Sequence, residues 1–453
     1  MTVFAADAAP ETGVAPVPPS RRALGLWETF VLWADLGVSF LVMVVGMFLV
    51  PGLGLAEAIV AIVVGALIGN TLLGLAAAIG ADTGVPTMVL LRAALGIRGS
   101  YLPTALNILQ LLGWASLEVI VMAQAADALA TRFLGLPSAY PLWVVVFTAI
   151  TLAMALSGPI AVIKKYLARF AIWAVLGSIV WITFALLTSF DVGAALRRPG
   201  TGAMSFWLAV DLVVALPISW FPLVADYSRF ARSRSAAFWG TGLGYFVPHV
   251  WFYLLGALLV VSAGVVGDPS APITPLLAGI AGLTAGWLAL LLLLIGETDE
   301  AFANLYSTAV SVQNLMPRAS QRTILLAGGV LVLLIALFVP LVQYESFLLL
   351  IGAAFIPLLG LLTADYFVVR GGQYHATALF LKRGPYWYRG GINWAAIGVW
   401  LAGACGYLLI AGLPAAGVTG LAPWLGASLP SFLIAFGLYA IVGRLTPVKE
   451  RTT

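Results

Sequence analysis

The chain has 453 residues, of which 62% are hydrophobic and 9% are charged, and its formal net charge is +4. Soluble globular proteins carry roughly 25% charged residues, so this chain has too few charges to cover a surface that faces water. The composition therefore excludes a soluble enzyme or a nucleic-acid-binding protein and predicts an all-α polytopic membrane protein. The single cysteine, Cys405, cannot form an internal disulfide.

Twelve apolar segments are long enough to cross a bilayer as helices, which takes roughly 20 residues each. The predicted transmembrane helices are residues 27–50, 54–79, 103–131, 141–158, 161–188, 204–225, 238–264, 285–312, 323–341, 346–369, 392–413 and 425–443. The segment from Pro86 to Leu95 is too short to cross, and we expect it to lie at the interface or to be re-entrant.

The distribution of Lys and Arg predicts the orientation, because positively charged loops are retained in the cytoplasm. With the N-terminus inside, 18 of these residues lie on the cytoplasmic side and only Arg132, Arg197 and Arg198 lie on the other. We therefore expect a multi-pass protein of the cell (inner) membrane with cytoplasmic tails at residues 1–26 and 444–453.

Two five-span blocks, 27–188 and 204–369, invite comparison, because transporters are often built from inverted repeats whose first helices are broken. Two further predicted helices, within residues 392–443, follow them. Both first helices carry helix-weakening residues at mid-depth: Gly37, Ser39 and Gly46 in the first span, and Pro217, Ser219 and Pro222 in the sixth. An ordinary kink explains either span alone, but matching positions in two blocks favour a binding site at broken helices.

Carboxylates inside the predicted spans are the most informative residues, since each ionisable group at mid-membrane costs at least ~2.5 kcal/mol. They are Asp35, Glu118, Asp211, Glu297, Asp299 and Glu300. Basic residues are nearly absent at this depth. These carboxylates must therefore be protonated, face water, or bind a cation or a ligand rich in hydrogen-bond donors.

The acidic cluster at residues 296–300 predicts a cation site in the eighth span. Hard cations prefer several oxygen ligands, which makes Thr298 and Asp299 candidate ligands. Glu297 and Glu300 are three residues apart on one helix face, and either is a candidate protonatable group. The alternative is a polar stripe that faces a water-filled vestibule.

Trp114 and Glu118 lie one helical turn apart in the third span, on the same face. An indole can stack on a flat ring, and the neighbouring carboxylate can accept hydrogen bonds from ring N–H and amino groups. The pair therefore predicts a site for a flat heterocycle that bears hydrogen-bond donors.

Several motifs resemble the nucleobase:cation symporter-1 family, also called the purine and cytosine permease family, over about residues 32–370. They are Gly69-Asn70 with Ile79-Gly80-Ala81-Asp82-Thr83-Gly84, Arg98-Gly99-Ser100-Tyr101-Leu102-Pro103, Gln110 to Trp114, Ala225-Asp226-Tyr227-Ser228-Arg229-Phe230, and Ala364-Asp365-Tyr366. The resemblance implies a LeuT-like fold with ten core helices in two inverted repeats and two peripheral helices. It also implies inward movement of one substrate with a cation.

The resemblance also implies roles for particular residues. Trp114 corresponds to the tryptophan that stacks on the substrate ring, and Glu118 stands where the family's hydantoin transporter has a glutamine. A carboxylate there favours amino-bearing bases over a hydantoin. The implied cation ligands are Asp35, Val38, Thr298 and Asp299, and the other implied substrate contacts are Ser39, Phe40, Ser219, Trp220 and Asn304.

The sequence thus predicts a secondary active importer of a nucleobase or a related flat nitrogen heterocycle, such as cytosine, a purine or an aminopyrimidine. We expect a sodium or proton gradient to drive it, without a cofactor, a nucleic-acid partner or an obligate protein partner, in the lipid bilayer. One alternative is an amino-acid or amine symporter of the same fold, with Glu118 or Asp35 pairing with a substrate ammonium. Another is a membrane receptor that binds its ligand without transporting it.

Overall fold

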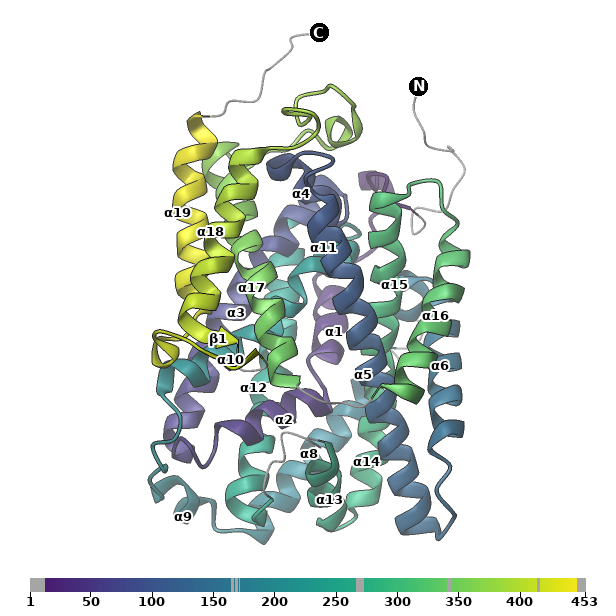
Figure 1. The fold of residues 1–453 in the computed structure, drawn as a ribbon. Helices are drawn as coiled ribbons and strands as arrows, with labels where there is room; N and C mark the ends of the chain where they lie inside the picture. Colours follow the sequence, from purple (N-terminus) through teal and green to yellow (C-terminus); the bar gives the residue numbers. More distant parts are fainter. Residues whose placement is uncertain are drawn as a thin grey trace.

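The structure, a computed structural model, describes residues 13–163, 167, 170, 172–265, 273–339, 344–413 and 416–445. In this part of the chain, long apolar helices pack side by side into one bundle (Figure 1). The only strands among the described residues form a short antiparallel hairpin, β1 (Gly412–Leu413) and β2 (Val418–Thr419). Four of the 18 Lys and Arg residues counted above as cytoplasmic lie outside the described residues: Lys164, Lys165, Lys449 and Arg451. Arg169, inside the fifth predicted span, also lies outside them.

The helices follow the predicted spans closely. In the first half they are α1 (Leu26–Leu36), α2 (Phe40–Leu49), α3 (Leu55–Thr83), α4 (Thr87–Leu95), α5 (Tyr101–Leu134), α6 (Tyr140–Ser157), α7 (Pro159–Ala161), α8 (Ile172–Ser189) and α9 (Val192–Arg197). The second half contains α10 (Phe206–Ser219), α11 (Phe221–Ser228), α12 (Arg234–Ala263), α13 (Ile273–Gly282), α14 (Gly286–Gly296), α15 (Thr298–Leu315), α16 (Gln321–Phe338), α17 (Tyr344–Thr363), η3 (Ala364–Val369), α18 (Trp394–Ala411) and α19 (Ser428–Leu445).

Ten helices of the described chain are long and apolar enough to cross a membrane, and the bent pair α1–α2 makes up to eleven. The prediction of an all-α polytopic membrane protein is confirmed. The remaining predicted span, 285–312, corresponds to α14 and α15, which are separate helices that meet at Glu297. The short apolar helix α13 was not predicted, because its ten residues are too few to cross a bilayer.

The first span is broken, as predicted. The axes of α1 and α2 differ by 61°, and the chain between them leaves the helical conformation. Ser39 is extended, with φ −145° and ψ 145°, and its hydroxyl accepts a hydrogen bond of 3.1 Å from the backbone N–H of Leu41. Ser39 therefore caps α2 at its N-terminus, which explains why a new helix begins here.

The sixth span is less interrupted than its two prolines suggest. Only Trp220 separates α10 from α11, and its φ of −82° and ψ of −16° remain close to helical values. The backbone N–H of Trp220 donates to Pro217, and that of Leu223 donates to Trp220, so the chain forms a tight turn. The expectation of a broken helix in the sixth span is therefore wrong: residues 206–228 form one nearly continuous apolar helix.

The two halves pack against each other reciprocally. The first span, α1 and α2, packs on α12, whereas the sixth span, α10 and α11, packs on α3. The third span, α5, packs on α15 of the eighth. Each half therefore contributes its first and third helices to the interior of the bundle.

One end of the bundle, which we call the α4 end, contains α4, the loop at 370–393 and the first and last described residues (Figure 1). Here residues 13–25, the N-terminal strap, cross the ends of α3 and α11. The Val17 N–H donates to Gly84, the Arg22 guanidinium donates to the carbonyl of Ala81, and Leu24 pairs with Ala231. Burial lowers the pKa of the Arg22 guanidinium, and the charge of Asp82 opposes this shift.

Candidate functional site

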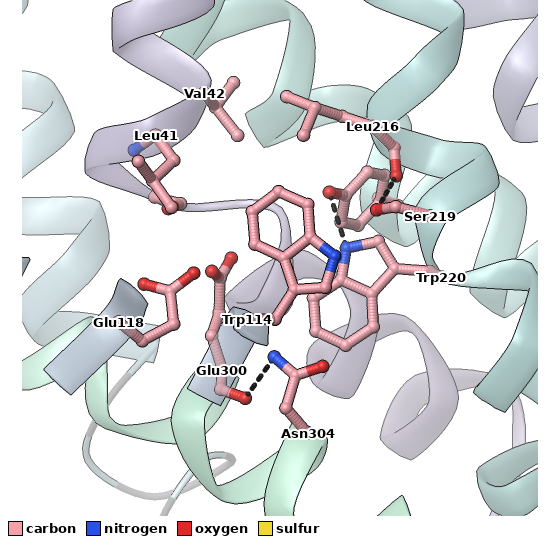
Figure 2. Close-up of a pocket in the computed structure, with 11 residues that line it drawn as sticks. Leu41, Val42, Trp114, Glu118, Leu216, Ser219, Trp220, Glu300 and Asn304 are labelled. Carbon is pink, nitrogen blue, oxygen red and sulfur yellow. Dashed lines mark hydrogen bonds between the residues drawn. The ribbon is translucent and has the colours of Figure 1, made fainter. Parts of the chain in front are cut away.

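A pocket in the interior of the bundle lies between the two interrupted spans and the helices α5, α12 and α15 (Figure 2). It is lined by Ser39, Leu41, Val42, Trp114, Glu118, Leu216, Ser219, Trp220, Tyr245, Glu300 and Asn304. Six of the seven predicted ligand contacts are among these residues. The seventh, Phe40, does not line the pocket: its side chain is fully buried, and its backbone N–H faces Glu297 instead.

Two tryptophans form the aromatic part of the wall. Trp114 is 6% exposed and packs edge-on against Phe347 of α17, with ring centroids 5.2 Å apart. Trp220, from the tight turn between α10 and α11, donates a hydrogen bond of 2.8 Å from Nε1 to the hydroxyl of Tyr245. The hydrogen bond fixes the orientation of the Trp220 ring, so the pocket offers a rigid face on which a flat ligand can stack.

The polar part of the wall is acidic. Glu118 and Glu300 are 1% and 4% exposed and line the pocket, whereas Glu297 is fully buried and does not line it. One carboxylate oxygen from each of the three lies within 4.8 Å of the others. Two ionised carboxylates at this separation repel each other by about 3 kcal/mol at an effective dielectric constant of ~20. No Lys, Arg or His among the described residues lines the pocket.

Glu297 has a structural partner that the sequence did not reveal. Its carboxylate accepts hydrogen bonds from the hydroxyl of Ser39, at 2.9 Å, and from the backbone N–H of Phe40, at 3.2 Å. It therefore occupies the N-terminus of α2, where the free N–H groups and the helix dipole favour a negative charge. The break in the first span is therefore bound to the junction between α14 and α15.

The predicted cation ligands lie where the first and eighth spans meet. Asp35 and Asp299 are fully buried and interact electrostatically, and neither carboxyl has a hydrogen-bond partner among the described residues. Thr298 donates its hydroxyl to the carbonyl of Ile295 at 2.8 Å, and Val38 is fully buried. Buried carboxylates are costly unless they are paired with a charge, a proton or a donor, so this arrangement suits a bound cation.

Asp211, the remaining intramembrane carboxylate, has a different role. Its two oxygens accept hydrogen bonds from the backbone N–H groups of Ala427, at 3.0 Å, and Ser428, at 2.6 Å. These residues begin α19, so Asp211 caps a peripheral helix and takes no part in the pocket. The partners are more than 200 residues away in sequence, which is why sequence reasoning could not identify them.

Sequence analysis did not identify Tyr245 as a pocket residue. The only sequence signal for it was a tyrosine hydroxyl inside the seventh predicted span.

The space left in the pocket for a water-sized sphere is about 20 Å³, which is room for a single water molecule. The structure is therefore closed around the pocket, and side chains or helices must move before a ring can enter.

Comparison with solved structures identifies the class of protein. The chain aligns with Mhp1, a nucleobase-cation-symport-1 family transporter solved in a closed conformation with bromovinylhydantoin bound, with a TM-score of 0.80 and 22% identity over 96% of this chain and 95% of Mhp1. A Na+-coupled sialic acid symporter aligns with a TM-score of 0.63 and 13% identity, over 95% of this chain and 92% of that one. The fold of this chain is therefore LeuT-like.

Sequence comparison then gives the family. Residues 16–426 match the family of permeases for cytosine/purines, uracil, thiamine and allantoin, and the chain belongs to this family. The hydantoin permease of Microbacterium maritypicum is 26% identical over 402 residues, covering 85% of this chain and 81% of the relative. The cytosine permease of Escherichia coli K12 is 29% identical over 421 residues, covering 89% and 91%.

Proposed function

We propose that the protein is a symporter that imports a nucleobase or a related flat nitrogen heterocycle, such as cytosine, a purine or an aminopyrimidine. The observation that carries the proposal is that Trp114 and Glu118, one turn apart on α5, line one pocket with Trp220. Stacking between indoles suits a flat ring, and the carboxylate suits its N–H groups. Relatives named for transport of cytosine and hydantoin support this substrate class.

The proposed coupling ion is sodium or a proton, bound where α1 and α15 meet. Its ligands would come from Asp35, Val38, Thr298 and Asp299, which supply carboxylate, carbonyl and hydroxyl oxygens. The buried carboxyls of Asp35 and Asp299 support this assignment, because neither has a hydrogen-bond partner in the described part of the chain. Each charge carried inward gains ~2.3 kcal/mol per 100 mV of membrane potential, which can drive accumulation of the substrate.

In the proposed orientation, the α4 end and both termini face the cytoplasm, because most Lys and Arg residues of the loops are on that side. Two inverted repeats, 27–188 and 204–369, would rock against each other to expose the pocket alternately to either side of the membrane. Residues 392–443 would form a peripheral support. In this proposal, the small free space in the pocket would belong to a closed intermediate of the cycle.

The direct test is uptake into proteoliposomes of radiolabelled cytosine, adenine and hydroxymethylpyrimidine, each with a sodium gradient, with a proton gradient and with neither. We expect accumulation of at least one of these rings when one gradient is imposed. Failure to bind or take up any flat nitrogen heterocycle would overturn the proposal.

The acidic wall of the pocket also favours a second candidate, an amino-acid or amine symporter in which Glu118 pairs with an ammonium group. The Glu118→Gln variant separates the two. A cationic amine should lose its binding when the charge is removed, whereas a neutral ring should still stack on Trp114 and bind measurably.

A further inference from the structure

A second cavity lies between α3, α10 and α19, on the far side of α10 from the pocket that Trp114 lines. Val210 and Val214 of α10 line this cavity, whereas Leu216 and Ser219 of the same helix line the pocket. With 3.6 residues per turn, the two pairs occupy opposite faces of the helix. The cavity measures about 180 Å³, against about 20 Å³ for the pocket. One helix therefore separates the small pocket from a much larger space.

The wall of this second cavity is mostly hydrocarbon. Ile68 of α3 and Leu429, Pro430 and Leu433 of α19 complete its apolar lining. The charged side chain in the wall, Asp211, uses both oxygens to accept backbone N–H groups at the start of α19. No Lys, Arg or His of the described chain lines the cavity. A buried water needs about three polar partners, and this wall has too few of them to fill such a volume with water. The cavity therefore suits an apolar ligand.

The cavity adjoins the apolar outer surface of the bundle. Its exposed lining residues include Trp207, Leu429 and Leu433, and on α3 the nearby exposed side chains are Val63 and Leu67. Both α3 and α19 are long and apolar enough to cross a membrane, and α19 lies at the edge of the bundle (Figure 1). Helix surfaces of this kind face the hydrocarbon core of the bilayer, so lipid chains are the molecules with direct access to the cavity.

Two tryptophans mark the end of the cavity at which α10 begins. Trp207 is the second residue of α10, and Trp424 belongs to η6 (Pro423–Leu425), which precedes α19. Both indoles are exposed, and the Ser205 hydroxyl donates a hydrogen bond of 3.0 Å to the carbonyl of Trp424. Exposed tryptophans are enriched at the level of the lipid headgroups. A lipid whose headgroup lies at this level can extend a chain inward along α10.

We propose that this cavity binds one acyl chain of a membrane phospholipid, with the headgroup at the level of Trp207. An apolar cavity of about 150 Å³ in another protein binds benzene, so a cavity of about 180 Å³ accommodates a chain segment of at least that size. The chain packs between α10 and α19, beside the contact that Asp211 makes with α19. It thereby supports the helix whose opposite face lines the pocket.

The test is photochemical crosslinking in phosphatidylcholine liposomes that contain a small fraction of phosphatidylcholine with a diazirine on one acyl chain. After irradiation and proteolysis, mass spectrometry locates the labelled residues. We expect residues 207–214 of α10 to be labelled severalfold more than α8, whose exposed side chains Trp173 and Phe184 measure ordinary contact with the bilayer. Equal labelling of α8 and the cavity residues would overturn the proposal.

A variant that blocks the cavity makes the test specific. Leu433→Trp places an indole at an exposed position of the lining and should reduce the labelling of residues 207–214 at least severalfold. Leu438→Trp, at an exposed position further along α19 and outside the lining, is the matched control and should leave the labelling unchanged. The melting temperature of each variant in detergent shows whether it is folded. If Leu433→Trp does not fold, Leu429→Trp blocks the same cavity from another exposed position.

Two further outcomes would contradict the lipid site. One is labelling of residues 207–214 that a folded blocking variant leaves unchanged. The other is a dimer in which a second copy of the chain protects α19 from labelling, because the occupant would then be protein. The measurements use no transported solute, so their result is independent of the proposed function.

Discussion

The hydroxyl of Ser39 donates a 2.9 Å hydrogen bond to the carboxylate of Glu297, a residue 258 positions away in sequence. Ser39 lies at the break in the first span, and Glu297 is the single residue between α14 and α15, with φ −64° and ψ −18°. The first span is therefore joined to the junction between α14 and α15 by one carboxylate, which also caps α2. The wall of the pocket depends on this contact, because Ser39 and Glu300 both line it.

Glu297→Gln should lower both the melting temperature and the uptake rate. The substitution removes the charge at the N-terminus of α2 and turns an amide N–H toward the N–H of Phe40, at a cost of about 1–3 kcal/mol. The measurements are thermal unfolding in detergent and uptake in proteoliposomes. The matched control is Glu28→Gln, since Glu28 accepts a backbone N–H at the start of α1 but lies outside the pocket. Similar behaviour of the two variants would contradict a special role for Glu297.

Trp114→Ala should weaken cytosine binding roughly 5- to 150-fold, because stacking of a base on an aromatic side chain contributes ~1–3 kcal/mol. Trp114→Phe keeps a smaller aromatic face and should lie between the alanine variant and the wild type. Binding is measured by calorimetry. The control is Trp173→Ala on the outer surface of α8, where the side chain is 64% exposed. Unchanged affinity of Trp114→Ala would show that the ring does not stack there.

Asp299→Ala should abolish the dependence of uptake on the coupling ion while leaving the protein inserted and folded. The variant removes a carboxyl that is fully buried and has no hydrogen-bond partner among the described residues. The measurement is cytosine uptake as a function of ion concentration, with Glu57→Ala as the control at an exposed carboxylate. If Asp299→Ala still couples uptake to the same ion with unchanged affinity, the assignment of this cation site is wrong.

Asp211→Asn should destabilise the protein by about 1–2 kcal/mol without changing its affinity for cytosine. An amide cannot accept both backbone N–H groups at the start of α19 as a carboxylate does, and capping contacts contribute energies of this size. Thermal unfolding and calorimetry on the same preparation separate the two effects. A variant with weakened binding and an unchanged melting temperature would place Asp211 in the binding machinery, against the geometry described here.

The N-terminal strap should detach when its arginine contact is removed. In a Cys405→Ser background without other cysteines, Val17→Cys places a thiol at a position that is 2% exposed. Adding Arg22→Ala should increase its labelling rate with a polar maleimide at least severalfold. Ser20→Cys, at an exposed position of the strap, should label at the same rate with or without Arg22→Ala. Equal rates for Val17→Cys in both backgrounds would argue against a docked strap.

Span positions could be predicted from the sequence because the thickness of the bilayer fixes the length of an apolar helix. The break in the first span was also predictable, because Gly37 and Ser39 weaken a helix locally. The sixth span did not follow the same expectation. Pro217 and Pro222 are compatible with a nearly continuous helix when the backbone between them forms one tight turn, as it does at Trp220. Local residue types give the place of an interruption but not its width.

Contacts between distant segments lay beyond sequence reasoning. Asp211 was a candidate for ligand binding because a carboxylate inside a membrane is costly, yet backbone donors of α19 satisfy it. Phe40 was assigned to the pocket from its position at the break, but the extended conformation of Ser39 directs Ser39, not Phe40, toward the cavity. The roles of Asp211 and Phe40 therefore depend on their neighbours in the fold, which the residue type alone does not reveal.

The tightness of the pocket has a consequence for selectivity. The pocket has room for one water molecule, so side chains must move aside to admit a ring and must then pack against that ring before the pocket can close again. A ring with a bulky substituent could lodge between the tryptophans and still prevent closure, so it would occupy the protein without being carried. The protein would then distinguish a transported substrate from an inhibitor when the pocket closes, and the two could bind with equal affinity.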